Sequence, residues 1–523
     1  MVKASTGEPI KKAGVYLQKI DDPRSGYSAH TDAAGHFAVE KIDSGRYNLR
    51  IERTGFVSQS YSETSATSRG AVLTLTPGRE MKDLIFRLVP WGVISGRIAD
   101  ENGDPIPGTS VEAMRHFVDE GKRTLQAVQT AETNDLGEFR LYGLSKGRYF
   151  VRAQIRGEWQ SLAAASANDS ATDETGYSPV YYPGTADEAR AATIEVIAGQ
   201  EVPAIDFTLI PVRSFRVTGH VFDAVLGQPA KDCFVVLLRR DPNESGFFFN
   251  DQAQTSCQKG SFEFSSVPPG SYYVSAMSSS AGKRRVARAA IEVENSNVTD
   301  VGMTFVQGTN ITGRIRIEGH EAMDFSDVHL WLTDPEQYFN GGVGAVVKPD
   351  GTLTIENLAE GRYRIQTHSM PPGVPADFYL KDAQANGESI LDKALTIVAG
   401  GNQVTLEITM SSAGARVDGT VTDENGLPSA GAIVALIPEE GRRKLFRLYK
   451  DSTTDQYGKF ILRGIAPGKY KVFSWNDVEN NAWEDADFLK PFEDQGKEIT
   501  AEENGRITLQ LKLTATDKAK QSQ

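Results

Sequence analysis

Thr454-Asp455-Gln456-Tyr457-Gly458-Lys459-Phe460, followed by Gly468-Lys469-Tyr470, is the part of the chain that decides its fold. One glycine stands two residues before Phe460, and a second stands two residues before Tyr470. Glycine supplies the positive φ that a tight turn needs, and the residues between the two turns alternate between apolar and polar side chains. The segment therefore predicts a β-strand between two turns, with both aromatic rings in the core of a sandwich.

This pair of glycines recurs five times, and its members are always ten residues apart. The first glycine precedes Phe or Leu, at Gly35, Gly137, Gly260, Gly351 and Gly458. The second precedes Tyr, at Gly45, Gly147, Gly270, Gly361 and Gly468. Successive glycines of the first kind lie 102, 123, 91 and 107 residues apart, a length typical of a seven-strand sandwich. We predict an all-β chain, a tandem array of five Greek-key (prealbumin-like) β-sandwich domains.

A second signature, read as strand, Asn-Gly turn and strand, marks where a repeat begins. It is clearest in residues 95–105 and 418–428, and weaker copies begin at Gly219 and Gly313. The predicted repeats one to five are residues 1–90, 91–212 (with a long inserted loop), 213–307, 308–411 and 412–523. Because the linkers between them are short, we expect a semi-rigid, elongated array.

Repeat one begins inside its first strand. Nine residues separate Gly96 from Pro105, and nine separate Gly419 from Pro428, so the glycine that matches Pro9 would fall just before Met1. We therefore expect a truncated first strand, with any signal peptide upstream of this chain. The edge left open should favour self-association by strand pairing.

The composition sets limits on the partners. A chain of 523 residues is too long for one core, and its 39% hydrophobic and 24% charged residues are typical of folded, soluble domains. The net charge of −13 disfavours nucleic acid and anionic membranes as partners. No apolar run reaches the roughly 18 residues that a transmembrane segment needs.

These motifs resemble carboxypeptidase regulatory-like domains, which are related in fold to transthyretin and to collagen-adhesin B-type repeats. The order of the repeats, with Tyr181-Tyr182-Pro183-Gly184-Thr185 and Phe378-Tyr379-Leu380-Lys381, resembles multidomain proteins common in Acidobacteria. The resemblance implies an extracellular, periplasmic or cell-surface location. It specifies fold better than function, because the module serves as spacer, adhesin segment or sugar-binding domain. Repeat three departs from the pattern, with Cys257 where repeat five has Asp455.

The sequence offers no catalytic constellation. A zinc peptidase needs a His and a Glu three residues apart and a distant second His. None of the seven histidines has this Glu; only His116 and His220 precede a carboxylate at that spacing, in Asp119 and Asp223. We expect no enzyme activity, no metal and no cofactor.

Aromatic residues outside the core pattern are the candidates for ligand binding. Residues 154–193, inserted in repeat two, carry Trp159, Tyr177, Tyr181 and Tyr182, and sugars stack on such rings. Packing between domains is the alternative role for these residues. The same two roles are open to Trp475, Trp483, Phe488 and Phe492 and to Phe247, Phe248 and Phe249. Cys233 and Cys257 form either a disulfide or two buried thiols.

The leading hypothesis for function is a non-catalytic structural or adhesive protein of the cell envelope, or a secreted one, with glycans or envelope proteins as partners. The first alternative is an array of carbohydrate-binding modules. The second alternative is an accessory region of an exported peptidase or outer-membrane transporter.

Overall fold

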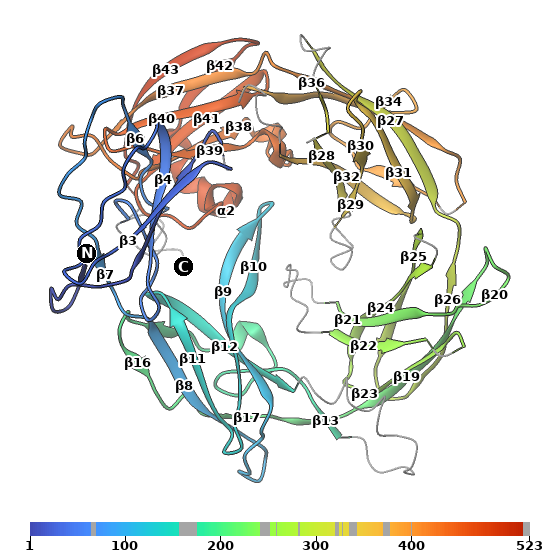
Figure 1. Ribbon diagram of the computed structural model, residues 1–523. Coiled ribbons are helices and arrows are strands. Elements are labelled where there is room, and N and C mark those ends of the chain that lie inside the picture. Colours follow the sequence, from blue (N-terminus) through green and yellow to red (C-terminus); the bar gives the residue numbers. More distant parts are fainter. Residues whose placement is uncertain are drawn as a thin grey trace.

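The computed structural model describes residues 1–22, 24–63, 69–155, 175–240, 252–257, 259–280, 283–318, 324–326, 328–333, 342–369, 377–398 and 400–515. Strands dominate this part of the chain, and its helices are short turns (Figure 1). The all-β prediction is confirmed.

Buried apolar residues gather in one main cluster for each predicted repeat. These clusters run from Met1 to Leu88, Ile94 to Leu209, Phe215 to Phe305, Ile311 to Met410 and Ala415 to Leu511. None of these clusters crosses a predicted cut near residue 90, 212, 308 or 412. Each predicted repeat thus has an apolar core of its own, while independent folding of the five units stays a prediction.

Repeat five shows the plan of the sandwich. Its first strand, β37 (Ala415–Thr422), lies between β40 (Lys459–Ile465), which is antiparallel to it, and β43 (Arg506–Lys512), which is parallel. The facing sheet has the order β39 (Lys450–Thr453), β38 (Ile433–Pro438), β41 (Gly468–Trp475) and β42 (Lys497–Ala501). Every residue of β38 is buried, because the helical turns η5 (Ala482–Glu484), α2 (Ala486–Leu489) and η6 (Lys490–Gln495) and their neighbours cover its second face.

Repeats two to four follow this plan, with a first strand at the centre of one sheet. In repeat two the strands are β8 (Gly92–Ala99), β11 (Glu138–Leu144), β16 (Glu201–Val202) and β17 (Phe207–Thr208), facing β10 (Lys122–Glu132), β9 (Thr109–Asp119), β12 (Gly147–Ile155), β14 (Val180–Tyr181) and β15 (Ile194–Val196); β13 (Thr175–Tyr177) pairs with β18 (Pro211–Arg213). In repeat three they are β20 (Gln228–Pro229), β19 (Phe215–Asp223), β23 (Ser261–Val267) and β26 (Val298–Phe305), facing β22 (Gln252–Ser256), β21 (Cys233–Arg239), β24 (Gly270–Ser280) and β25 (Lys283–Val293). In repeat four they are β30 (Val346–Val347), β31 (Thr352–Leu358), β27 (Thr309–Glu318), β36 (Val404–Ser411), β33 (Tyr379–Ala385) and β34 (Glu388–Ser389), facing β29 (Val343–Gly344), β28 (His329–Thr333), β32 (Gly361–Ser369) and β35 (Leu395–Ile397).

Repeat one keeps a short first strand. Its β1 (Val2–Lys3) pairs in parallel with β7 (Arg87–Leu88), and the other sheet has β3 (Gly26–His30), β2 (Gly14–Lys19), β4 (Gly45–Glu52), β5 (Gln59–Ser60) and β6 (Leu73–Leu75). The ammonium group of Met1 donates to the carbonyl oxygen of Gly35 at 2.7 Å, as the Val421 amide donates to Gly458 at 2.8 Å. Residues 36–40, the counterpart of β40, form no strand.

The two glycines of each pair have different structural roles. Positive φ is confirmed at the first glycine of all five pairs, with values from 70° to 85°. At the second glycine the prediction is wrong for Gly45 and Gly147, which do not have positive φ. Gly45 instead makes room for a neighbouring ring: a Cβ there would lie 3.3 Å from the side chain of Tyr47.

The tyrosine after the second glycine is a core residue in every repeat, as predicted. Its hydroxyl also donates to the carbonyl oxygen four residues upstream, at 2.8–3.0 Å. The five donors are Tyr47, Tyr149, Tyr272, Tyr363 and Tyr470, all at most 4% exposed. Each tyrosine therefore contributes apolar burial and closes the turn before its own strand.

The repeats follow one another around a ring, with repeat one beside repeat five and the β9–β10 hairpin projecting inward (Figure 1). The predicted elongated shape is therefore wrong. Contacts at the junctions fix the angle between neighbours: the Trp91 amide donates to the Gly55 carbonyl at 3.1 Å, and the Trp91 ring lies 5.7 Å from that of Tyr142. Between repeats four and five, the Tyr379 hydroxyl donates to Glu503 at 2.8 Å.

Candidate functional site

The predicted aromatic site of repeat two does not gather on one face. Tyr181 is 5% exposed and packs with Met114 and Leu125 in a small cluster outside the main core. Tyr177 and Tyr182 pack, partly buried, against the main core of the same repeat, where the Tyr182 ring meets Phe207 edge-on at 5.9 Å. Trp159 lies outside the described residues. Ligand binding by these four residues stays a prediction.

The other aromatic candidates of repeat five serve packing. Trp475, Trp483 and Phe492 are at most 1% exposed and lie between β38, β41 and the helical turns. Trp475 and Trp483 are stacked, with ring centroids 6.3 Å apart. These rings therefore pack inside repeat five, and Trp483 also contacts Arg69 of repeat one. Phe247, Phe248 and Phe249 lie outside the described residues.

The two histidines that precede an aspartate by three residues, His116 and His220, make packing and ion-pair contacts. His116 lies on β9 against the Phe150 ring, with centroids 5.3 Å apart, and burial first and nearby arginines second lower its pKa to about 4. His220 faces Asp300, with Nδ1 3.0 Å from the carboxylate. Among the described residues, no three His, Cys, Asp or Glu side chains converge to hold a metal ion. No helix in the same ranges has the length and apolar character to cross a membrane.

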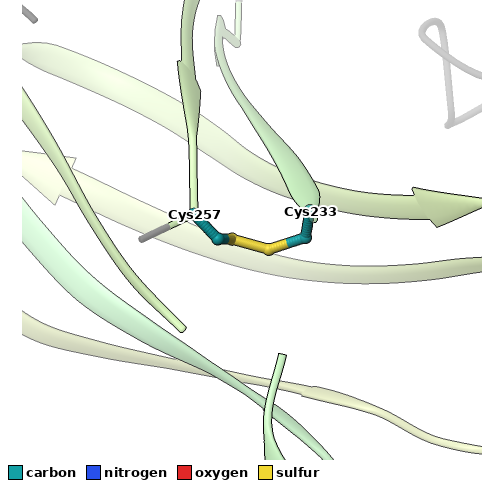
Figure 2. Close-up of a disulfide and its surroundings, with 2 residues drawn as sticks. All are labelled: Cys233 and Cys257. Carbon is teal, nitrogen blue, oxygen red and sulfur yellow. A yellow bond between two sulfur atoms is a disulfide. The ribbon is translucent and has the colours of Figure 1, made fainter. Parts of the chain in front are cut away.

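Cys233 and Cys257 are joined by a disulfide in repeat three, shown in Figure 2. Their Cα atoms are 5.1 Å apart, within the usual range for a disulfide. The bond ties the start of β21 to the residue that follows β22. The predicted correspondence of Cys257 with Asp455, which counts residues back from the glycine of the turn, is wrong by one residue. The Cys257 amide donates to the Cys233 carbonyl at 2.7 Å, and the equivalent bond in repeat five joins the Thr454 amide to the Ala432 carbonyl at 2.9 Å. The turn of repeat three is one residue shorter, so Cys257 takes the place of Thr454.

Residues 69–79 of repeat one dock on repeat five. The Thr74 amide donates to Gln456 Oε1 at 2.9 Å, and Gln456 Nε2 donates back to the Thr74 carbonyl at 2.7 Å. The Thr74 hydroxyl donates to Asp455 Oδ2 at 2.8 Å. Arg69 pairs with Asp451 and lies over the Trp483 ring, 5.5 Å from its centroid. Backbone and side chains together therefore close the ring.

The tip of the β9–β10 hairpin joins three repeats. Glu120 of repeat two pairs with Arg364 of repeat four, at 2.6 Å between Nη1 and Oε2. Glu484 of repeat five faces the same tip, where burial first and the carboxylates of Asp119 and Glu120 raise its pKa to about 7. Backbone hydrogen bonds from Gly121 and Glu120 act in the opposite direction, but they are outweighed.

A groove of about 710 Å³ lies between repeats three and four. Its described lining is largely apolar, with Met303, Val306 and Ile397 among the side chains, and Asn357 and Thr396 add polar groups. Its charged lining residues are three arginines, Arg285, Arg288 and Arg362, and one acid, Glu360. The spacing of the arginines in the sequence gives no sign that they meet, so sequence reasoning missed this groove.

Fold and contacts define an all-β protein of successive β-sandwich repeats that contact one another. Residues 1–78 and 93–175 match the carboxypeptidase regulatory-like domain family, so the first two repeats carry this domain. For repeats three to five, and for the Acidobacterial group, the resemblance stays a prediction. A search of curated proteins finds no match to the chain.

The chain is also similar to solved structures of other proteins. The Streptococcal ancillary pilin is 11% identical, with 58% of this chain and 93% of that chain covered and a TM-score of 0.19. The TIE protein of Bacillus anthracis is 13% identical, with 83% and 76% covered and a TM-score of 0.16. The major pilin subunit of Bacillus cereus is 14% identical, with 61% and 99% covered and a TM-score of 0.15.

Proposed function

We propose that this chain is a non-catalytic structural or adhesive protein, located outside the cytoplasm in the cell envelope or secreted. The observation that carries the proposal is the fixed contact between neighbouring repeats, including the reciprocal hydrogen bonds of Thr74 and Gln456 that join the first repeat to the last. A closed set of small sandwiches holds surfaces in fixed relative positions, which suits a scaffold or an adhesin.

Two further observations support the proposal. The disulfide between Cys233 and Cys257 suits an oxidising compartment, because disulfides persist in exported proteins and are rare in the cytosol. Domains of the family matched by repeats one and two serve as spacers and binding modules in different hosts, so the family match agrees with this role.

The test is cosedimentation of the purified chain with isolated bacterial cell envelopes. We expect saturable binding without release of reducing sugar ends or new amino termini. Turnover of envelope glycan or peptide at a rate above that of the buffer would overturn the non-catalytic part, and absence of saturable binding would overturn the adhesive part. The matched control is the chain reduced with dithiothreitol, which loses the disulfide while its sequence is unchanged.

The groove between repeats three and four favours the second candidate function, a carbohydrate-binding module. Its volume lies within the range of small-molecule sites, roughly 300–1,000 Å³. Apolar walls with a few polar side chains, such as Asn357 and Thr396, match the two kinds of surface that a sugar presents.

A further inference from the structure

The groove between repeats three and four is cationic in a chain of net charge −13. Arg285 is held in place by an ion pair with Asp223, and both side chains are largely buried. Arg288 lies over the Tyr273 ring, with its guanidinium carbon 3.3 Å from the ring centroid, and Arg240 lies 4.8 Å from the same centroid. These contacts hold the guanidinium groups of repeat three in fixed positions, which lowers the entropy lost when a ligand binds.

Arg362 completes the charged lining from the other side. It belongs to β32 of repeat four and is exposed. It has no ion-pair partner among the residues that the structure describes. A guanidinium group binds a carboxylate through two parallel hydrogen bonds, and partial exclusion of water by the groove strengthens this contact. Arg362 is therefore the residue of the groove best suited to receive a carboxylate from a ligand.

The remaining lining determines which carboxylates fit. Exposed apolar side chains such as Val306 and Val398 suit the C–H face of a sugar ring, and the exposed Thr396 suits its hydroxyl groups. Arg285 is already paired with Asp223, and Glu360 offsets part of the charge of the other two arginines, so a polyphosphate chain would bring more negative charge than the groove can neutralise. The acidic side chains of a peptide carry a carboxylate without a ring that has a C–H face and hydroxyl groups. These features together favour an acidic sugar.

We infer that the groove binds a glycan through a uronic acid residue, whose carboxylate is received by Arg362 and whose ring lies on the apolar wall. This inference deepens the proposed adhesive role, on which it rests, by naming the class of glycan that the chain would hold. The site combines residues of two repeats, so it exists only where repeats three and four are fixed to one another.

The test is isothermal titration calorimetry of the full chain with trigalacturonate. Its fully methyl-esterified form, which has the same shape without charge, is the matched probe. We expect the acid to bind with a Kd between about 1 mM and about 1 µM and the ester to give no measurable heat. Arg362→Gln should weaken binding of the acid about tenfold to a hundredfold, and Arg362→Lys should weaken it less, because lysine keeps the charge but not the paired hydrogen bonds.

Arg506→Gln is the control variant. Arg506 is also exposed, lies on β43 of repeat five, and has no ion-pair partner within the described ranges. Equal melting temperatures of the two Gln variants and the parent chain would show that each is folded. Equal binding of acid and ester, or undiminished binding in Arg362→Gln, would overturn the inference. So would equally tight binding of inorganic phosphate or of an aspartate peptide with the same charge.

The calorimetry and the envelope experiment fail separately. Loss of trigalacturonate binding with persistent cosedimentation would remove the groove proposal and leave the adhesive role. Binding of trigalacturonate without cosedimentation would leave the groove proposal and remove the adhesive role.

Discussion

Repeats three and five fasten the same two strand ends by different chemistry. In repeat five the buried Thr454 hydroxyl accepts from the Ala432 amide at 2.9 Å and donates to the Ser429 carbonyl at 2.6 Å. Repeats one and two have the same arrangement at Thr31 and Thr133. In repeat three Cys257 occupies this position and is bonded to Cys233, the counterpart of Ala432. Four of the five repeats thus link these strand ends through a hydroxyl group or a disulfide, whereas repeat four has Val347 at the equivalent position.

The largest expected effect comes from removing the covalent link. Cys233→Ala with Cys257→Val should lower the free energy of unfolding of repeat three by ~3 kcal/mol, since the bond closes a loop with a sequence separation of 24 residues. Chemical denaturation monitored by amide exchange in repeat three measures this change. Cys233→Ala with Cys257→Thr is the sharper comparison, because it places a hydroxyl where repeat five has one and should recover part of the loss. Equal stability of the two double variants would contradict the equivalence of Cys257 and Thr454.

The turn after this position gives the next effect. Gly458 has a φ of 70°, and a Cβ there would lie 2.6 Å from the Val421 carbonyl oxygen. Gly458→Val should therefore destabilise repeat five by ~1–3 kcal/mol, through strain of the left-handed backbone and this contact. Thermal denaturation with repeat-specific amide exchange measures it. Gly441→Val, at a position with no atom within 4 Å of a Cβ, is the control. A loss no larger than that of the control would contradict the strain argument.

Removing the hydroxyl of the link in repeat five should have a smaller effect. Thr454→Val keeps the shape of the side chain but leaves the Ala432 amide and the Ser429 carbonyl without their partner, and we expect a loss of about 1–2 kcal/mol. Thr454→Ser retains the hydroxyl and should lose less. Urea denaturation of the full chain, followed at Trp475 and Trp483, compares the two variants. A serine variant as unstable as the valine variant would indicate that the methyl group, not the hydroxyl, matters.

Repeat one extends the comparison, because it has the Thr31 link but leaves residues 36–40 unpaired in the described chain. We predict weak self-association through this edge, with a Kd of about 1 mM to about 10 µM. Ala38→Pro removes one backbone donor from the edge and should weaken the association severalfold. Sedimentation equilibrium over a range of concentrations measures both proteins. Identical association of the parent and the Pro variant would mean that another surface is responsible.

The repeated glycines and tyrosines made the sandwich fold predictable, because each marks a turn or a core position in its own repeat. What they could not predict is contact between distant segments. Residues 69–79 and 451–483 carry no shared pattern, so ring closure was missed. The need for a strand-interior glycine was missed for the same reason: a Cβ at Gly419 would overlap the carbonyl oxygen of Leu509, which lies 90 residues away in the sequence. The burial of Tyr181 inside its own repeat was likewise not predictable from the aromatic residues of the repeat two insertion.

The smallest effect concerns a contact that repeat five makes and repeat three does not, between Glu484 and the β9–β10 hairpin tip. Burial and the nearby Asp119 and Glu120 raise the pKa of Glu484 to about 7, above its ordinary value of 4.5. Separation of the tip from repeat five would remove these influences, so the docked form holds more protons between the two values. Docking should therefore weaken as the pH rises through this window and stay constant above it.

Amide exchange at Gly121, measured from about pH 5 to about pH 8 and corrected for intrinsic rates, should show falling protection in the parent chain. Glu484→Gln removes the titrating group and should flatten the profile, while Glu479→Gln, a change on the same segment outside this contact, should leave it as in the parent. A profile in Glu484→Gln with the parent's slope would assign the pH dependence to Asp119 and Glu120 instead.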